Sequence, residues 1–330
     1  MTKLIKLLAA LTVAAATGGV APGIAHAQTW KPDNAVEIIA PSAAGGGTDH
    51  TARVIQKIIQ DQRLLDVPVT VVNKPGGGGS VALTYLKQYA GNAHHIEVAS
   101  AVLLTNHIVG RSPMNYTDFS PIALLQSEYV VLAVKSDSPF RTGNDLIAQL
   151  KQDPGSVSFA VGTSLGGANH SAAAALALAA GVDPRKLKTV VFKSSSESAV
   201  AALGGHVDVM AASASQALRH VRSGAMRLLV VSAPQRLGGE LASVPTLKEF
   251  GVNASVNNFR FLIGAAGLTG AQLEFWDGIL SKLAQTPEWK QDLEKNLYEN
   301  THLTSADTRT YLEREYAELK ALMKEMGLAK

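Results

Sequence analysis

The 330-residue sequence contains no cysteine, and its positive and negative charges nearly cancel. The absence of cysteine excludes disulfides and a lipid anchor on a cysteine, so ordinary core packing has to stabilise the fold. The formal net charge of +3 includes Lys3 and Lys6 at the N-terminus. Such a balance gives no electrostatic reason to expect nucleic acid or an anionic membrane as a partner.

Long apolar runs are also scarce, and the one near the N-terminus indicates a signal peptide. An apolar stretch over residues 7–20 follows the two lysines, and Ala25 and Ala27 satisfy the small-x-small rule of signal peptidase. The stretch is too short and too rich in Ala and Gly to favour a membrane anchor. We therefore predict a signal peptide over residues 1–27, cleavage after Ala27, and a periplasmic protein of residues 28–330, which is long enough for two domains.

Short apolar runs alternate with helix-like segments through most of the chain. This alternation favours an α/β fold with parallel sheets covered by helices on both faces. From Gly270 onward, segments that begin with Ser or Thr caps carry apolar residues at helical spacing, which predicts a helical layer without strands. The predicted strands are Val36–Ala40, Val67–Val72, Ile96–Ser100, Tyr129–Val134, Val157–Val161, Thr189–Phe192, Val207–Ala211, Leu228–Ser232 and Phe261–Ala265.

Two loops rich in Gly, Pro and Ser, at residues 135–144 and 233–251, have the composition of crossings between domains. They predict a first lobe of residues 28–134 plus 250–330 and a second lobe of residues 135–249. Two crossings make a hinge, and the cleft between such lobes is where ligands usually bind.

Three glycines, Gly45, Gly46 and Gly47, stand between the first predicted strand and a helix for which Thr48 and Asp49 are suitable caps. The N-terminus of a helix carries partial positive charge and unpaired N–H donors. Bare glycine backbone before it therefore forms a site for an oxyanion such as a carboxylate or phosphate. A turn that merely needs positive φ is the structural alternative.

The same layout recurs twice along the chain. Four glycines precede Ser80, and Gly162, Gly166 and Gly167 precede a helix in the second lobe. Neither segment fits the P-loop or the G-x-G-x-x-G dinucleotide fingerprint. Amide donors in both lobes that face one cleft suit a small organic anion, and no cofactor is predicted.

One pattern favours an enzyme instead. Residues 162–166, GTSLG, satisfy the G-x-S-x-G pattern of serine hydrolases between a strand and a helix, and Asp208 and then His220 or His302 follow in hydrolase order. The pattern is short, no HGGG-type oxyanion loop precedes it, and Asp208 is not in a loop after a strand. A periplasmic esterase with Ser164 as nucleophile is therefore the alternative to a binding protein without enzyme activity.

Two further clusters are weaker candidates. His94 and His95 could hold a metal, but adjacent residues on a strand point to opposite faces, so no metal site is predicted. The hydroxyls of the segment KSSSES are predicted to cap the next helix through Ser194 or Ser195, to face the cleft, or both.

Several motifs in sequence order resemble the substrate-binding receptors of tripartite tricarboxylate transporters, also called Bug proteins. The resemblance covers essentially all of residues 28–330. It implies a two-lobed, type II-like periplasmic binding fold that closes around a carboxylate, and a two-component membrane permease driven by an ion gradient as partner. We expect a monomer and a di- or tricarboxylate ligand, aromatic dicarboxylates included. The motifs are IIAPSAAGGGTDHTAR, VTVVNKPGGGGSVA, DFSPIALL, DPGSVSFAVGTSLGGANHSA, VVFKSSSESAVAALGGHVDVM, RSGAMRLLVVSAPQR and SVPTLKEFG.

The resemblance also implies which residues contact the ligand. The first binding loop corresponds to residues 42–49, where an alanine replaces the usual proline and the amide donors remain. The second-lobe loop corresponds to residues 162–170, where Ser164 is expected to donate a hydrogen bond. The predicted contacts are Ser42, Ala43, Gly45, Gly46, Gly47, Thr48, Asp49, Ser100, Thr105, Thr163, Ser164, Gly166, Gly167, Asn169, His170, Ser194 and Ser213.

Arg260, in the segment NNFRFLIGAAGL, is the predicted specificity residue. Many members of the family have a Trp-x-Gly segment here, and citrate-type members resemble WRG. An arginine that enters the cleft could bind a second carboxylate through two hydrogen bonds. A surface arginine at the start of a strand is the alternative.

Overall fold

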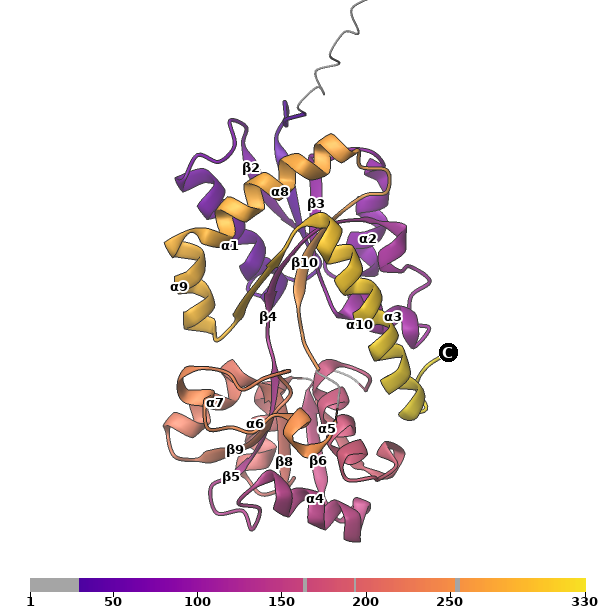
Figure 1. Cartoon of the computed structure of the whole chain (residues 1–330), viewed down its shortest axis with the longest axis vertical. Coiled ribbons are helices and arrows are strands. Elements are labelled where there is room, and N and C mark those ends of the chain that lie inside the picture. The colour runs from indigo at the N-terminus through magenta and orange to yellow at the C-terminus, as the bar shows by residue number, and fades with distance from the viewer. Residues whose placement is uncertain (1–29, 163–164, 193, 253–255) are drawn as a thin grey trace, which may run out of the picture.

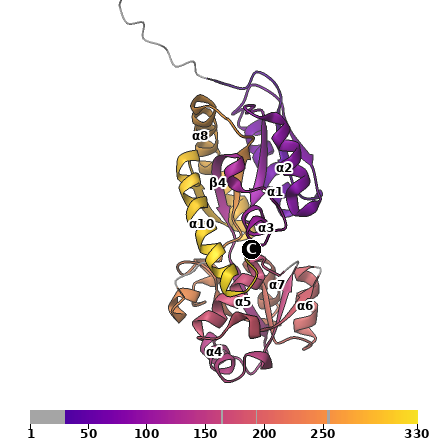
Figure 2. The same ribbon diagram turned by 90° about the vertical axis from the view of Figure 1, so that its right-hand side faces the viewer.

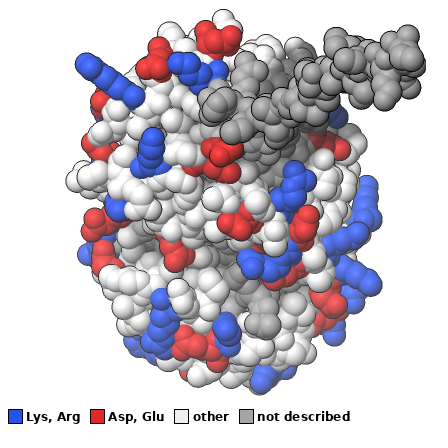
Figure 3. Space-filling view, turned by 45° about the horizontal axis from the view of Figure 1, so that its top comes forward, with Lys and Arg blue, Asp and Glu red and all other residues white. Residues whose placement is uncertain are grey.

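The computed structural model describes residues 30–162, 165–192, 194–252 and 256–330 (Figure 1). The described chain forms two α/β lobes, one above the other along the long axis, each built on its own β-sheet. None of the helices in these ranges is long and apolar enough to cross a membrane. Basic and acidic side chains are intermixed over the face seen in Figure 3.

The first sheet, with the helices packed on it, forms lobe I. Its strand order is β11-β4-β10-β3-β1-β2. β1 pairs in parallel with β2 and β3, whereas β10 runs antiparallel to both β3 and β4, and β11 runs antiparallel to β4. The strands are β1 Val36–Ala40, β2 Val69–Asn73, β3 His95–Ser100, β4 Ser120–Ser127, β10 Arg260–Gly264 and β11 Glu299–Leu303.

The second sheet belongs to lobe II and has the order β7-β6-β8-β5-β9. β6 pairs in parallel with β7 and β8, and β5 runs antiparallel to β8 and β9. The strands are β5 Val130–Lys135, β6 Ser158–Gly162, β7 Lys188–Phe192, β8 Val209–Ser213 and β9 Met226–Val231.

Helices cover both faces of each sheet, as the apolar strands require. In lobe I, α1, α8 and α9 pack on one face and α2, α3 and α10 on the other; in lobe II, α4 and α5 oppose α6 and α7. The helices are α1 Gly47–Asp61, α2 Ser80–Leu86, α3 Val102–Ile108, α4 Gly143–Gln152, α5 Ala168–Ala179, α6 Ser195–Leu203, α7 Ala214–Arg222, α8 Gly270–Gln285, α9 Pro287–Asn296 and α10 Ser305–Glu325.

Local sequence explains why these segments fold as they do. Helix α1 buries Ile55, Ile58 and Ile59 at helical spacing against the sheet. Thr142 and Thr269 begin α4 and α8 with capping boxes, in which the threonine hydroxyl accepts from the third residue of the helix. Side-chain periodicity and caps therefore set the ends of these helices.

All nine predicted strands are present, with ends that differ by at most two residues, and the α/β class is confirmed. The prediction of parallel sheets needs correction, because β5 and β10 each follow a passage between the lobes and run antiparallel to their neighbours. β4 and β11 were missed. The prediction of no strand after Gly270 is therefore wrong: β11, with the sequence ENTHL, is a half-buried edge strand that has few apolar residues to reveal it.

The chain passes between the sheets at other places than the loop compositions predicted. β4 ends in lobe I at Ser127 and β5 begins in lobe II at Val130, so the first passage is at residues 128–129 and not at 135–144. The return lies at residues 256–259, where the Asn258 N–H donates to the Glu128 carbonyl at 2.8 Å. We call residues 128–129 and 256–259 the crossing segments.

Helix α10 also connects the lobes (Figure 2). It packs on β4 and α3 of lobe I and reaches α5 of lobe II. The Lys330 N–H donates to the Ile108 carbonyl at 3.0 Å, which fixes the C-terminal end beside α3. The two lobes therefore share the two crossing segments and one helix.

Candidate functional site

A cavity of about 340 Å³ lies between the lobes. α1, α3 and β10 line it from lobe I, and the first turns of α5, α6 and α7 line it from lobe II. We call this cavity the cleft. It brings together seven of the predicted ligand contacts, namely Gly47, Thr105, Gly166, Gly167, Asn169, Ser213 and Arg260.

In the first glycine junction, the loop before α1 is held by its own side chains. The Ser42 hydroxyl accepts from the Thr48 hydroxyl at 2.7 Å and from the Asp49 N–H at 3.2 Å, so Ser42 caps the helix. Within the described residues, the N–H groups of Gly47 and Thr48 have no such partner. Two amide donors at the positive end of α1 are left for a ligand.

Asp49 braces this loop and does not line the cleft. Its buried carboxylate accepts from the Gly45 N–H at 2.8 Å, from Asn73 at 2.8 Å and from Arg53 at 3.0 Å. Burial alone would raise the pKa of Asp49, but these hydrogen bonds outweigh it and hold the pKa below its usual value. The carboxylate is therefore ionised and occupied within the loop.

Gly47 allows Arg260 to approach the backbone closely. A methyl group at Gly47 would lie 2.5 Å from Nη2 of Arg260, closer than real side-chain atoms approach. The guanidinium therefore lies against the first turn of α1 at Gly47, whose N–H is one of the two unpaired donors.

The second-lobe loop supplies the N-terminus of α5, where Gly167 and Asn169 line the cleft. His170 lies within the loop instead, because its Nδ1 accepts from the Gly166 N–H at 3.0 Å and its ring is buried. Burial lowers the pKa of His170 to about 4, so the ring is neutral and acts as an acceptor. Thr163 and Ser164 lie outside the described residues.

The other predicted contacts fall beside the cleft. Ser194 caps α6 by accepting from the Glu197 N–H at 3.2 Å, and its neighbour Ser195 lines the cleft in its place. Ser42, Thr48 and Ser100 line a separate cavity of about 250 Å³ in lobe I, together with Gly76, Gly78 and Gly79 of the second glycine junction. Neither the cleft nor this cavity has Ala43, Gly45 or Gly46 in its lining.

Arg260 is the most distinctive group in the cleft. It is 7% exposed, so the alternative of a surface arginine is wrong. Its Nη1 lies 3.8 Å from Oε2 of Glu128, too far for a hydrogen bond, and its guanidinium lies 5.5 Å from the centre of the Tyr298 ring. Nε and Nη1 have no hydrogen-bond partner in the part of the chain that the structure describes. A buried cation with free donors requires an anion to complete it.

Sequence reasoning missed several residues of the cleft. Glu128 and Asn258 come from the crossing segments, Arg111 and Tyr298 from the loops after α3 and α9, and Ser215 from the first turn of α7. The position of Glu128 next to a crossing was a usable signal, but the crossing itself was placed too late in the chain.

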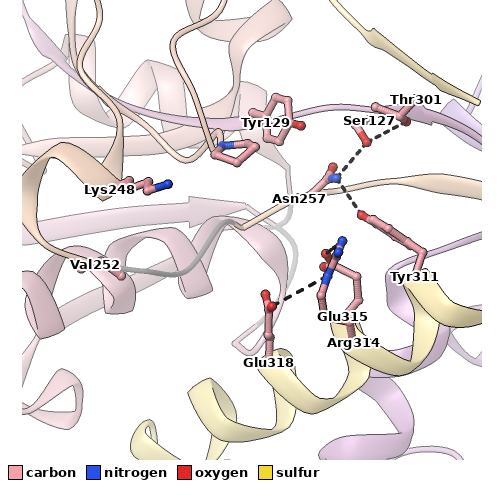
Figure 4. Close-up of a pocket in the computed structure, with 11 residues that line it drawn as sticks. Ser127, Tyr129, Lys248, Val252, Asn257, Thr301, Tyr311, Arg314, Glu315 and Glu318 are labelled. Carbon is pink, nitrogen blue, oxygen red and sulfur yellow. Dashed lines mark hydrogen bonds and ion pairs between the residues drawn. The ribbon is translucent and has the colours of Figure 1, made fainter.

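A second cavity, of about 360 Å³, lies at the crossing segments (Figure 4). Ser127, Tyr129 and Asn257 line it, whereas Glu128 and Asn258 line the cleft. Neighbouring residues of an extended segment point to opposite sides. The crossing segments therefore separate the cleft from this second cavity, which we call the hinge cavity.

The geometry does not assemble the predicted hydrolase triad or a metal site from described residues. Asp208 accepts from the Ser158 N–H at 2.8 Å, at the end of β6 opposite to Gly162. His220 lies in the last turn of α7, whereas the first turn faces the cleft. Across residues 30–162, 165–192, 194–252 and 256–330, no group of three His, Asp or Glu side chains could hold a metal ion.

Two α/β lobes, two crossing segments and a polar cleft between helix N-termini define a two-lobed solute-binding protein. Residues 51–328 match the model of the tripartite tricarboxylate transporter family receptor, so the chain belongs to that family. The resemblance seen in the sequence motifs is thereby confirmed. Receptors of this family are solute-binding proteins and not enzymes.

Individual proteins are similar to this chain in sequence or in fold. The UPF0065 protein in the gbd 5′ region of Cupriavidus necator is 28% identical over 324 residues, which cover 98% of this chain and 97% of that protein. A TctC solute-binding protein from Polaromonas, solved with no ligand, matches with a TM-score of 0.78 and 25% identity, covering 89% of this chain and 99% of that one. An R. palustris protein solved with adipate matches with a TM-score of 0.74 and 20% identity, covering 90% and 99%.

Proposed function

We propose that this protein is an exported receptor that captures a small organic di- or tricarboxylate in the cleft. The observation that carries the proposal is Arg260, a buried guanidinium with unpaired donors beside the free N–H groups at the start of α1. Both features favour an anion, and Gly47 and Arg260 both line the cavity between the two lobes. The adipate in the R. palustris relative is a dicarboxylate, which agrees with this ligand class.

The geometry supports the binding of the two ends of the ligand by different groups of the cleft. One carboxylate would accept from backbone N–H groups at the starts of α1 and α5, with ordered water to complete its shell. A second carboxylate would accept from Arg260. A monocarboxylate would leave the guanidinium unpaired, and so a dicarboxylate is the better match.

We further propose that binding closes the lobes about the crossing segments. Contacts from both lobes to one ligand stabilise the closed form over the open form. Residues 30–127 and 260–330 would move as lobe I, and the described residues between 130 and 252 as lobe II. The closed form would be recognised by a two-component permease, to which the receptor delivers its ligand as a monomer in the periplasm.

The proposal is tested by a thermal-shift screen of residues 28–330 against organic acids, after unfolding and refolding to remove any ligand that was purified with the protein. A ligand at a hundredfold excess over its dissociation constant adds about 2.7 kcal/mol to stability. We expect a raised melting temperature with at least one di- or tricarboxylate. A folded, ligand-free protein that responds to no carboxylate in a panel of aliphatic and aromatic acids would overturn the proposal.

A further inference from the structure

Glu128 is a carboxylate in a cleft that otherwise favours anions. It lies in the first crossing segment, is 6% exposed and lines the cleft beside Arg260. A second carboxylate of the ligand placed against it would be repelled at short range. Anion binding alone therefore does not explain why a buried carboxylate lines the cleft at this position.

The neighbours of Glu128 leave part of its hydrogen-bonding capacity free. From lobe II, the Ser215 hydroxyl donates to Oε1 at 3.2 Å, and from the second crossing segment, the Asn258 side-chain amide donates to Oε2 at 3.3 Å. Arg260 stands 3.8 Å away, and its unpaired donors show that the two charged groups do not form a close pair. An ionised carboxylate offers about four acceptor sites, so Glu128 can accept further hydrogen bonds from the cleft.

Arg260 and Glu128 together indicate which chemical groups one end of the ligand carries. A carboxylate that accepts from Arg260 brings the carbon next to it close to Glu128, because the guanidinium and the Glu128 carboxylate are neighbours on the same wall. A hydrogen-bond donor on that carbon would meet Glu128, whereas a bare methylene would leave a buried carboxylate without its remaining partners.

We infer that the ligand carries a hydroxyl or ammonium group on the carbon next to the carboxylate bound by Arg260, and that Glu128 accepts from this donor. The inference rests on the proposed function and narrows it from carboxylates in general to α-hydroxy or α-amino polycarboxylates. Glu128 would thereby select against the unsubstituted acid of the same length.

The test compares matched acids that differ only in this donor. Dissociation constants of refolded, ligand-free protein would be measured by titration calorimetry for succinate, malate and aspartate, and for glutarate, 2-hydroxyglutarate and glutamate. We expect one substituted acid to bind at least about tenfold more tightly than its unsubstituted parent, because a buried hydrogen bond to a charged group is stronger than one between neutral groups. The hydroxy and amino members of each series identify the donor.

Glu128→Gln separates selectivity from a purely structural role. The variant keeps the size of the side chain and removes its charge, so the preference for the substituted acid should fall to about threefold or less, most of all for an amino acid. An equal loss of affinity for substituted and unsubstituted acids would show that Glu128 only supports the hinge, and would overturn the inference.

The series on the unmodified protein decides the question even if the variant does not fold. Equal or tighter binding of an unsubstituted diacid would overturn the inference and leave the proposed function intact. Binding of no acid, in this series or in the wider carboxylate screen, would overturn the proposed function itself.

Discussion

The cleft and the hinge cavity are similar in volume and share the crossing segments as a wall, yet their polar groups are arranged differently. In the hinge cavity, Arg314 has Glu315 at 3.8 Å and Glu318 at 3.9 Å, so positive and negative groups accompany each other. In the cleft, Arg260 has a single carboxylate neighbour and two donors without a partner.

The hydrogen bonds show the same difference. In the hinge cavity, the Asn257 amide donates to Ser127 at 2.8 Å and to the Tyr311 hydroxyl at 3.1 Å, and Ser127 is 3.0 Å from the Thr301 hydroxyl (Figure 4). These bonds join the second crossing segment and the end of β4 to α10 and β11. The Oδ1 atom of Asn257 is an unpaired exception. Polar groups that largely satisfy one another stabilise a hinge, whereas unpaired donors at helix N-termini select a ligand.

Replacement of each of the two arginines by methionine, in separate variants, is the strongest test of this comparison. Arg260→Met should weaken binding of a dicarboxylate by roughly 100-fold, because a buried charged contact is worth about 2–5 kcal/mol. Binding of a monocarboxylate should change far less. Arg314→Met, in the hinge cavity, is the matched control and should leave both affinities nearly unchanged. Titration calorimetry measures all three proteins, and an equal loss for mono- and dicarboxylates in Arg260→Met would contradict a second carboxylate site.

Glu315 allows the hinge cavity to be tested through pH. Burial, aided by the charge of Glu318, raises the pKa of Glu315 from 4.5 to about 7. The folded protein therefore holds this proton more tightly than the unfolded chain, so the contribution is present below about pH 4.5 and is lost as pH rises through about 7. Glu315→Gln should reduce the fall in unfolding free energy between about pH 5 and about pH 8 by on the order of 2 kcal/mol.

Urea unfolding at the two pH values measures this effect. Glu318→Gln, one turn away and more exposed, is the matched control, and it should reduce the pH dependence only slightly, because burial is the main cause of the raised pKa of Glu315 and the charge of Glu318 is the lesser one. If Glu315→Gln retained the full pH dependence, Glu315 would not be buried as the structure shows.

Gly47→Ala tests the close approach of Arg260 to α1. The added methyl group would lie 2.5 Å from Nη2 of Arg260 and would displace the guanidinium. We expect about a tenfold loss of ligand affinity, since one charged hydrogen bond is misplaced, with little change in stability. Gly278→Ala, in an open position on α8, is the control and should bind normally. Normal binding by Gly47→Ala would place the guanidinium elsewhere in the bound protein.

Hinge motion should change the two cavities in opposite directions, because they lie on opposite sides of the same crossing segments. The sequence has no cysteine, so Lys248→Cys with Glu318→Cys creates the only thiols, one on each side of the hinge cavity. A ligand that closes the cleft should separate them and slow crosslinking by a short bismaleimide about threefold.

The control is a cysteine pair on one helix, Arg309→Cys with Glu313→Cys, whose separation does not change when the hinge moves. This pair should crosslink at the same rate with and without ligand. Crosslinking of the first pair that is equally insensitive to ligand would contradict closure about the crossing segments.

Elements with a strong local signal were predictable from sequence. β1 was placed with its observed ends, because its short apolar run is followed at once by Pro41 and a glycine-rich turn. Arg260 was singled out from its segment, and the structure places it in the cleft. β4 escaped notice although all eight of its residues are buried, because Pro121 interrupts the strand pattern near its start.

The roles of individual polar residues in the loops were less predictable. Thr48 and Asp49 were expected both to cap α1 and to bind the ligand, but Asp49 is occupied by Gly45, Asn73 and Arg53. Asn73 and Gly45 reach Asp49 from a different strand and from the preceding turn. No spacing in the sequence distinguishes a carboxylate that is satisfied within the loop from one that faces a ligand.

The sequence by itself determined the α/β class, the strands with strong apolar patterns, the family and the glycine-rich helix starts, because periodicity, caps and motif order are local properties. Only the tertiary structure decided where the chain crosses between the lobes, that β5 and β10 run antiparallel to their neighbours, and that Glu128 stands beside Arg260. These features depend on contacts between residues that are far apart in the sequence. Such contacts form only when whole lobes pack together, so they cannot be predicted from a single stretch of sequence.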